Sequence, residues 1–152
     1  MADLNLANEM VASCAARLGG GGRETAVKGI RAICRHFGGQ LLYLPRYKKD
    51  ESDTAEQFWG ILADAVGDAD ADVLLEVLMG QFGGVPLYIP KEDRAFRNEM
   101  AKEIKAEYDG TKQKRGELCR RYNMSFTQLY RLCHKALELE QEERSPTLFD
   151  NL

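Results

Sequence analysis

Apolar residues in the first two thirds of the chain recur every three or four positions, which is the spacing of one helical face. This pattern predicts one helix from Leu4 to Leu18 and a second from Glu24 to Phe37. Two more faces predict another helix pair, with Phe58, Ile61, Leu62, Ala65 and Val66 on one helix and Val73, Leu74, Val77, Leu78 and Phe82 on the next. The glycine pairs 38–39 and 83–84 are expected to end the second helix of each pair.

The two helix pairs belong to an internal repeat. The segment HFGGQLLYLPR (36–46) recurs as QFGGVPLYIPK (81–91) at an offset of 45 residues. Upstream, MVASCAARLG (10–19) matches FWGILADAVG (58–67) at an offset of 48. Each unit is therefore expected to contain two helices, a Gly-Gly pair, a short strand and a proline, with the units at about 2–46 and 54–91.

The predicted strands, 40–44 and 85–89, are too short to be stable alone. Their backbone groups need partners, so we expect the strands to pair either with each other or with those of a second chain, which would make 1–91 a dimerisation region. Pro86 lacks an amide hydrogen and is expected at an outward-facing position. The residues expected in this pairing are Gln40, Leu42, Tyr43, Leu44, Leu87, Tyr88 and Ile89.

A further helical pattern runs from Glu92 to Tyr108, and RGELCRRYNMSFTQLYRL (115–132) then has the apolar spacing of two short helices that cross at a tight turn. Asn123 is placed in the turn because asparagine tolerates a left-handed backbone, and Ser125 is expected to cap the second helix. The residues expected between the helices are Leu118, Tyr122, Met124, Leu129 and Leu132, with Cys119 at their closest approach.

The second of these helices is expected to run from Ser125 to about Leu139. Spacings of three and four predict a buried face of Phe126, Leu129, Tyr130, Cys133 and Leu137. The predicted fold is therefore mainly α with a short β element: tandem helix-helix-strand repeats, then a helix-turn-helix domain over 92–140. Residues 141–152 are acidic and contain Pro146, so a flexible tail is expected there.

Charge is unevenly distributed along the chain, whose net charge is −3. Residues 110–137 hold seven lysines and arginines against one acid, a net charge of +6, while residues 1–109 carry −5 and residues 138–152 carry −4. A basic block within an acidic chain favours phosphate contact at one face. The alternative is a solvated helical surface, but the block coincides with the predicted turn motif and therefore favours DNA.

Composition narrows the function classes. The apolar content of 44% indicates a globular protein, and neither a membrane span nor a secretion signal is recognisable, so a cytoplasmic location is expected. Cys14, Cys34, Cys119 and Cys133 are expected to be buried free thiols rather than metal ligands or disulfides. The run Gly19–Gly22 lacks the lysine of a P-loop. With no catalytic constellation, we expect neither an enzyme nor a metal or other cofactor.

The strings GGVPLYIP (83–90) and ELCRRYNMSFTQLYR (117–131) together resemble the Mor (middle operon regulator) and C activator family of Mu-like phages. The resemblance extends from about Val73 to the C-terminus. It implies a dimeric transcription activator with an N-terminal dimerisation region, a C-terminal helix-turn-helix and a contact with host RNA polymerase. Family members also direct their strand toward the DNA minor groove, which would involve Tyr88 and Lys91. The chain departs from the family in two respects. Pro86 stands where a glutamine is expected, and the upstream copy 10–46 would be absent from a family member with a single repeat unit.

These arguments predict a sequence-specific regulator of phage or prophage origin that binds double-stranded DNA. Gln128 and Arg131 are expected to read base edges, since an amide can pair with adenine and a guanidinium with guanine. Ser125 and Thr127 are expected at bases or phosphates. The expected phosphate contacts are Lys112, Lys114, Arg115, Arg120, Arg121 and Lys135.

Two alternatives stay open at this level. The chain could be a non-enzymatic protein-interaction module in which the C-terminal helices form only a packed hairpin. The two strand units could also pair within one chain and imitate a dimerisation core, whereas symmetric half-sites one DNA turn apart would still need a homodimer.

Overall fold

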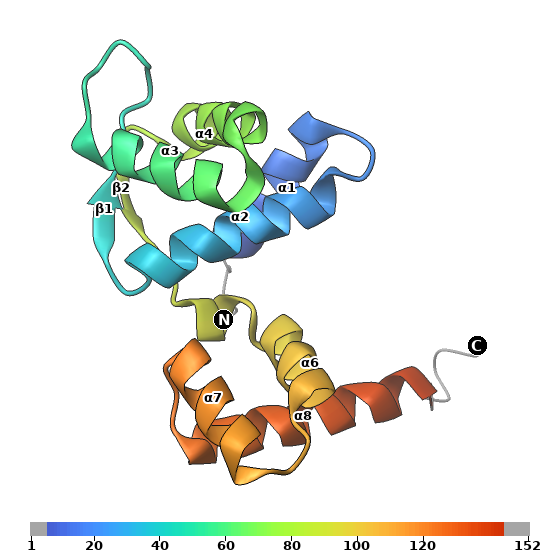
Figure 1. Ribbon diagram of the computed structural model, residues 1–152. Coiled ribbons are helices and arrows are strands. Elements are labelled where there is room, and N and C mark those ends of the chain that lie inside the picture. Colours follow the sequence, from blue (N-terminus) through green and yellow to red (C-terminus); the bar gives the residue numbers. More distant parts are fainter. Residues whose placement is uncertain (1–5, 145–152) are drawn as a thin grey trace. The chain divides into compact units, whose positions relative to one another are not determined.

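The computed structural model describes residues 6–144 (Figure 1). Over these residues the chain is mainly helical, with eight helices and one two-stranded sheet. It divides into two units, Met1–Ala95 and Phe96–Leu152. The predicted mainly α fold with a short β element is confirmed at this level.

The first unit contains two helix pairs, each followed by a strand, and a short closing helix. The elements are α1 (Leu6–Leu18), α2 (Gly22–Phe37), β1 (Leu41–Tyr43), α3 (Asp53–Val66), α4 (Asp68–Phe82), β2 (Pro86–Tyr88) and α5 (Glu92–Ala95). The predicted helices therefore form, while the strands are shorter than the five residues expected for each.

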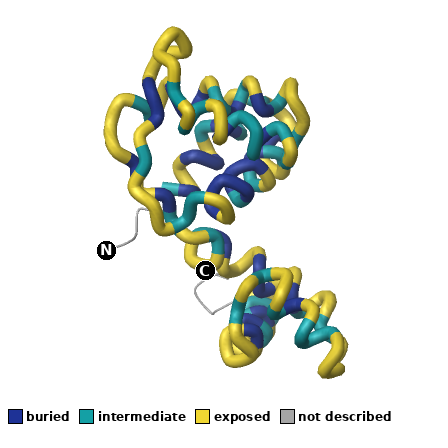
Figure 2. Tube along the Cα trace, turned by 60° about the vertical axis from the view of Figure 1, so that its left-hand side comes forward, coloured by how far each residue is buried: buried dark blue, intermediate teal, exposed yellow. Residues whose placement is uncertain are grey.

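Packing between the two helix pairs forms the core of this unit. Helix α1 contacts α2 and α4, and α3 contacts α2 and α4. The side chains buried there come from all four helices: Met10, Cys14, Ile30, Ile33, Phe58, Leu62, Leu74 and Leu78. Figure 2 colours the backbone trace by burial and shows buried segments on the helices of this unit. Because each fully buried aliphatic or aromatic side chain contributes roughly 1.5–3 kcal/mol, this shared core holds the two pairs together.

The two strands pair with each other, antiparallel and within one chain. Leu42 lies opposite Leu87, and the neighbouring pairs are Leu41 with Tyr88 and Tyr43 with Pro86. Every residue expected in the pairing takes part or flanks it: the Ile89 amide donates to the Gln40 carbonyl at 3.0 Å, and the Leu44 carbonyl accepts from Gly84 at 2.8 Å. Pro86 is exposed, as predicted.

Glycine ends α2 and α4, as predicted. The Gly38 amide donates to the Cys34 carbonyl at 2.9 Å, and the Gly83 amide donates to the Met79 carbonyl at 3.0 Å. The next residue in each case, Gly39 or Gly84, has a φ of +85° or +87°. Glycine adopts this left-handed backbone without steric cost, so the chain can turn directly into the strand.

The prediction of one helix from Glu92 to Tyr108 is wrong. Helix α5 ends at Ala95, Phe96 takes φ −125° and ψ 36°, and α6 (Arg97–Glu107) follows. Phe96 is buried, and its backbone leaves the helical region without any glycine or proline to mark the break. The sequence therefore contains no local signal for this break.

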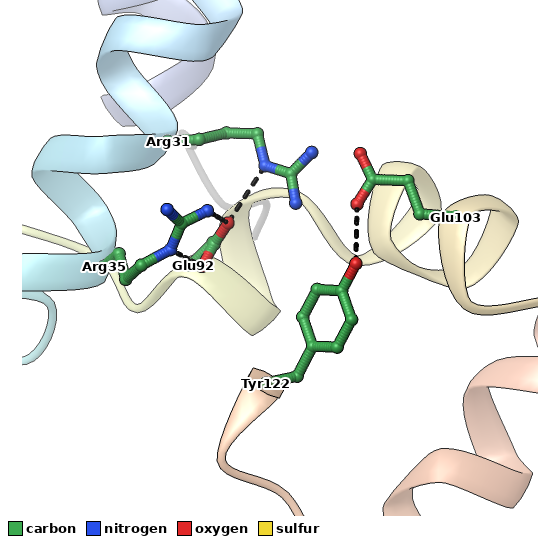
Figure 3. Close-up of polar contacts among 5 residues, drawn as sticks. All are labelled: Arg31, Arg35, Glu92, Glu103 and Tyr122. Carbon is green, nitrogen blue, oxygen red and sulfur yellow. Dashed lines mark hydrogen bonds and ion pairs between the residues drawn. The ribbon is translucent and has the colours of Figure 1, made fainter. Parts of the chain in front are cut away.

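Helix α5 is attached to α2 by ion pairs. The Arg31 Nε and the Arg35 Nη2 approach the Glu92 Oε2 at 3.0 and 2.9 Å, and the Arg35 Nε donates to Oε1 at 3.0 Å (Figure 3). The Arg31 and Glu92 side chains are only 12% and 11% exposed, so this pair is largely removed from solvent. Loss of Glu92 would remove the carboxylate that pairs with both arginines, whereas loss of Arg31 would leave Glu92 paired with Arg35.

The second unit packs α6, α7 (Lys112–Tyr122) and α8 (Phe126–Arg144) around a core of Ala101, Ile104, Leu118, Leu129, Leu132 and Ala136. Helix α8 continues four residues into the segment expected to be a flexible tail. Ion pairs between α6 and α8 favour this extension, with Lys105 to Glu140 at 2.6 Å and Lys102 to Glu143 at 3.2 Å. The rest of the expected tail, residues 145–152, lies outside the described residues.

Candidate nucleic-acid interface

Helix α7 begins at a capped N-terminus. The Thr111 Oγ1 accepts a hydrogen bond from the Lys114 amide at 3.1 Å. In turn, the Thr111 hydroxyl and amide donate to the Asp109 carboxylate at 2.7 and 2.9 Å. These hydrogen bonds from Thr111, the hydroxyl first, hold the pKa of Asp109 below its usual value, and nearby Lys114 adds to the effect. The start of α7 is therefore fixed by two short polar side chains.

The turn between α7 and α8 has the backbone that the sequence predicts. Asn123 takes φ 51° and ψ 55°, the left-handed conformation, and is the sole non-glycine with positive φ in the described part of the chain. The next amide, of Met124, donates to the Cys119 carbonyl at 3.0 Å, which satisfies an end of α7. The connection between the helices is consequently short.

Ser125 and Gln128 form a reciprocal cap at the start of α8. The Ser125 Oγ accepts from the Gln128 amide at 3.2 Å, and the Gln128 Oε1 accepts from the Ser125 amide at 2.9 Å. This arrangement is a capping box, which satisfies two backbone donors at once. The predicted cap at Ser125 is confirmed, but the Gln128 side chain was expected to point outward for base contact and is instead engaged with its own helix.

The three helices pack where the apolar spacing of 115–132 predicts. Leu118, Leu129 and Leu132 are buried, and Tyr122 and Met124 pack against them. Half-buried Cys119 lies in the same cluster. Tyr122 also donates a hydrogen bond to Glu103 of α6 at 3.3 Å (Figure 3).

The predicted buried face of α8 is partly wrong. Leu129 is buried and Cys133 half-buried, but Phe126, Tyr130 and Leu137 are 37%, 56% and 44% exposed. Leu132, which was expected between the helices, is buried, and so is Ala136, at spacings of three and seven from Leu129. Contact with α6 selects this face, because Ala101 and Ile104 complete the cluster on that side.

The exposed Phe126 and Tyr130 form an aromatic surface beside basic residues. The Phe126 and Tyr130 rings meet edge to face with centroids 4.6 Å apart. The Arg115 guanidinium lies 4.2 Å from the centroid of the Phe126 ring, a cation–π contact from α7 to α8. Arg115, expected to contact phosphate, is therefore held in place at the point where the two helices meet.

The other predicted phosphate contacts differ in their surroundings. Lys112 and Arg120 are exposed on α7, and Lys135 is half-buried on α8. Lys114 pairs with Glu117 at 3.2 Å, and Arg121 pairs with Glu107. An anion would have to compete with these carboxylates for Lys114 and Arg121, so the two pairs weaken the case for them as phosphate contacts.

Arg131 and Lys135 line an open hollow of about 480 Å³ on the second unit. Arg97 from α6 contributes to the same hollow, and the remaining lining residues are Tyr130, His134 and Glu138. Arg97 is not among the expected phosphate contacts, which all lie between residues 112 and 135, and Tyr130 was expected to be buried. A basic hollow beside an exposed helix can accept a polyanion, since guanidinium groups donate in a geometry that matches phosphate.

Tyr88 and Lys91, the residues implied for the minor groove, belong to the first unit. Tyr88 is 59% exposed, opposite Leu41 in the sheet, and Lys91 is exposed after β2. Thr127, the remaining predicted base contact, is exposed in the first turn of α8.

The structure also shows the surroundings of the four cysteines and of the residues that could bind a metal ion. The free cysteines Cys14 and Cys34 are buried as predicted, while Cys119 and Cys133 are half-buried. Burial raises the pKa of Cys14 to about 11 and, with Glu92 adding a smaller effect, that of Cys34 to about 12, so both thiols stay protonated and unreactive near neutral pH. Among residues 6–144, no three His, Cys, Asp or Glu side chains gather as a metal site. No helix in this range is long and apolar enough to cross a membrane.

Comparison with known proteins gives one match. The family model for the Mor transcription activator family matches residues 52–148, from the capping residue of α3 through the whole of α8. No curated protein and no solved structure matches the chain. The matched region contains the Gly-Gly-strand-proline segment of the second repeat unit and the capped α7–α8 pair, and it covers well over half of the sequence. The chain therefore belongs to the Mor transcription activator family.

Proposed function

We propose that this transcription activator binds promoter DNA sequence-specifically through α7 and α8, used as a helix-turn-helix with α8 in the major groove. The observation that carries the proposal is the coincidence of the family match with the exposed basic face of these two helices. The left-handed turn at Asn123 supports it, because the motif needs a tight connection between its helices. A phage or prophage origin and a contact with host RNA polymerase are further parts of the proposal, and both derive from the family.

Within this proposal, Arg131 is the main base-reading residue. Its side chain is exposed on α8 beside the hollow, and a guanidinium can bind both acceptors of guanine. Thr127 is a second contact. Gln128 would need both amide atoms to pair with adenine, and its Oε1 accepts from Ser125 within the cap. We therefore assign Ser125 and Gln128 mainly to positioning α8.

Phosphate contacts come from exposed and half-buried cations around that face. Lys112, Arg115, Arg120 and Lys135 are the proposed set, and Arg97 joins them because it lines the same hollow as Arg131. Lys114 and Arg121 would join after exchanging their carboxylate partners for phosphate. Each phosphate neutralised should release counterions and make binding more sensitive to salt.

A gel-shift experiment with the full chain and fragments of its neighbouring genomic DNA, repeated across a salt series, tests the proposal. We expect tight binding to one fragment, with affinity falling steeply as salt rises. Binding that shows no preference among fragments at any salt would contradict sequence-specific regulation. In that case the exposed Phe126–Tyr130 pair would favour the protein-interaction module.

The homodimer implied by the family is a separate prediction. A symmetric operator presents two half-sites and requires two reading helices, whereas the described chain contains one α7–α8 pair. A second chain can bind only if the dimerisation surface of the first unit is not already occupied within the same chain.

A further inference from the structure

We propose that the two repeat units of the first unit form a dimerisation core within one chain, so that residues 6–46 occupy the surface that a second copy would otherwise take. The pairing of β1 with β2 is the starting point. At the repeat offset of 45 residues, Leu42 is equivalent to Leu87, and these two lie directly opposite each other. Tyr43 is equivalent to Tyr88, and Leu41 is equivalent to Pro86. Tyr43 lies opposite Pro86, and Tyr88 lies opposite Leu41, so the two pairs are equivalent to each other. A strand pair that matches equivalent positions in this way has the symmetry of an isologous dimer.

Hydrogen bonds around the strands repeat the same symmetry. The Gly39 amide donates to the Ile89 carbonyl at 2.7 Å, and the Gly84 amide donates to the Leu44 carbonyl at 2.8 Å. Both donors are equivalent under the offset, and so are both acceptors. These bonds are reciprocal, as residue i contacting j and j contacting i requires in a two-fold interface.

Close backbone approaches are also reciprocal. A Cβ at Gly38 would lie 2.7 Å from the Lys91 Cα, and a Cβ at Gly83 would lie 3.0 Å from the Arg46 Cα. Arg46 and Lys91 are equivalent positions, so each repeat unit places its glycine against the backbone that follows the strand of the other repeat unit. Both positions require glycine for the same reason, which explains why the Gly-Gly pair recurs in both units.

Helix contacts follow the same rule. If α1 corresponds to α3 and α2 to α4, the contact of α1 with α4 is equivalent to that of α3 with α2, and both are present. Equivalent positions are buried alike: Met10 and Phe58 are 1% and 0% exposed, and Leu44 and Ile89 are both 0% exposed. The whole unit, not only its strands, is therefore arranged like a dimer.

Side-chain size favours pairing of the first repeat unit with the second repeat unit over pairing of two identical repeat units. A Cβ at Gly29 of α2 would lie 2.7 Å from the Leu74 Cδ1 of α4, and Gly29 is equivalent to Leu74 at the repeat offset. Two copies of the second repeat unit would place Leu74 against Leu74 and overpack this position. Two copies of the first repeat unit would place Gly29 against Gly29 and leave a void. Both changes destabilise a packed core.

Charge acts in the same direction, though weakly because the groups are exposed. Arg17 of α1 pairs with Glu76 of α4 at 3.0 Å. Arg31 is the equivalent of Glu76 in the first repeat unit, so two copies of the first repeat unit would set Arg17 against an arginine. The family match agrees with this division, since it begins at residue 52 and leaves the first repeat unit outside. The first repeat unit therefore serves as a permanent partner for the second repeat unit, and one chain carries one reading helix. This last step rests on the proposed function, and it replaces the homodimer.

Cysteine cross-linking in the full chain tests the internal pairing without reference to DNA. Leu41 and Tyr88 are opposite and exposed, at 68% and 59%. The bond from the Ile89 amide to the Gln40 carbonyl makes 41 and 88 a non-hydrogen-bonded pair, whose Cα atoms lie roughly 4.5 Å apart, within the range of a disulfide. We expect Leu41→Cys/Tyr88→Cys, oxidised with diamide, to form a disulfide within one chain and keep monomer mobility on a non-reducing gel.

The matched control mixes a tagged Leu41→Cys chain with an untagged Tyr88→Cys chain, with the parent chain and its four native cysteines oxidised alongside. No tagged–untagged disulfide above the parent background is expected. A strong mixed disulfide would overturn the proposal, because it would show that strands pair between chains.

A double-mutant cycle tests the size match. Gly29→Ala and Leu74→Ala should each lower the unfolding midpoint, and the combined variant should lose less than the sum of the two, because Leu74→Ala removes the atom that the new Cβ meets. Additive losses would contradict the size match.

The mass of the DNA complex then separates this inference from the proposed function. One chain per bound site is the expected result. Specific binding by two chains, together with an intermolecular cross-link between 41 and 88, would overturn the internal dimer but leave DNA binding intact. An intramolecular cross-link without specific DNA binding would support the internal dimer and contradict the proposed function.

Discussion

Single residues fix the geometry between α7 and α8. Asn123 carries a left-handed backbone that most side chains occupy at a cost of roughly 1–2 kcal/mol. Asn123→Ala should therefore lower the free energy of unfolding by about 1 kcal/mol, and Asn123→Val by more because it is β-branched. Asn123→Gly is the control and should be near neutral. Urea unfolding followed by circular dichroism measures the series, and equal stability of Ala and Gly variants would contradict the assigned turn.

Asp109 gives a pH-dependent prediction at the same scale. Its folded-state pKa is lowered by the Thr111 hydrogen bonds, so its contribution to stability is present above the unfolded-state pKa of about 3.9 and is lost as pH falls through the lower folded value. Asp109→Ala should lower the thermal midpoint at pH 6, and the difference from the parent chain should shrink below about pH 4. Asp64→Ala, at an exposed carboxyl on α3, is the control. A difference that stays constant down to pH 2.5 would rule out this role.

Helix α8 combines a structural start with an exposed face, and Gln128 separates the two roles. Gln128→Ala removes half of the capping box and should cost about 1 kcal/mol. Gln128→Glu keeps an acceptor for the Ser125 amide and should retain most of the stability. If Gln128 serves mainly as a cap, the Glu variant should also keep sequence preference in a gel shift. Full stability with lost preference would instead assign Gln128 to base contact.

The elements show how far sequence reasoning extends. Helix spacing and glycine pairs located α1 to α4, and the turn at Asn123 was predictable because few residues tolerate that backbone. The face of α8 was not, since Phe126 and Tyr130 satisfy the same three- and four-residue spacing as Leu129 and Leu132. Only the position of α6 decides between these faces. The break at Phe96 has no local signal, whereas the reciprocal cap of Ser125 and Gln128 follows the capping-box pattern S-x-x-Q and is readable from the sequence.

At the scale of the whole molecule, the distribution of charge and the internal repeat give the two units different roles. The basic block falls on α7 and α8, while the first unit is acidic overall and pairs its strands internally. An acidic first unit should reduce non-specific adhesion to DNA, so that binding depends on the basic face. The arrangement predicts a chain whose DNA preference is set by a few residues of α8 and whose general affinity is set by the surrounding cations.

The most direct test compares Arg131→Ala with Lys112→Ala on the best-binding genomic fragment and on random DNA, with Lys28→Ala in the first unit as a charge-matched control. We predict that Arg131→Ala costs roughly 1–3 kcal/mol on the preferred fragment and much less on random DNA. Lys112→Ala should weaken both alike and reduce the salt slope by about one, and Lys28→Ala should change neither. Equal losses on both DNAs for Arg131→Ala and Lys112→Ala would contradict sequence reading by α8.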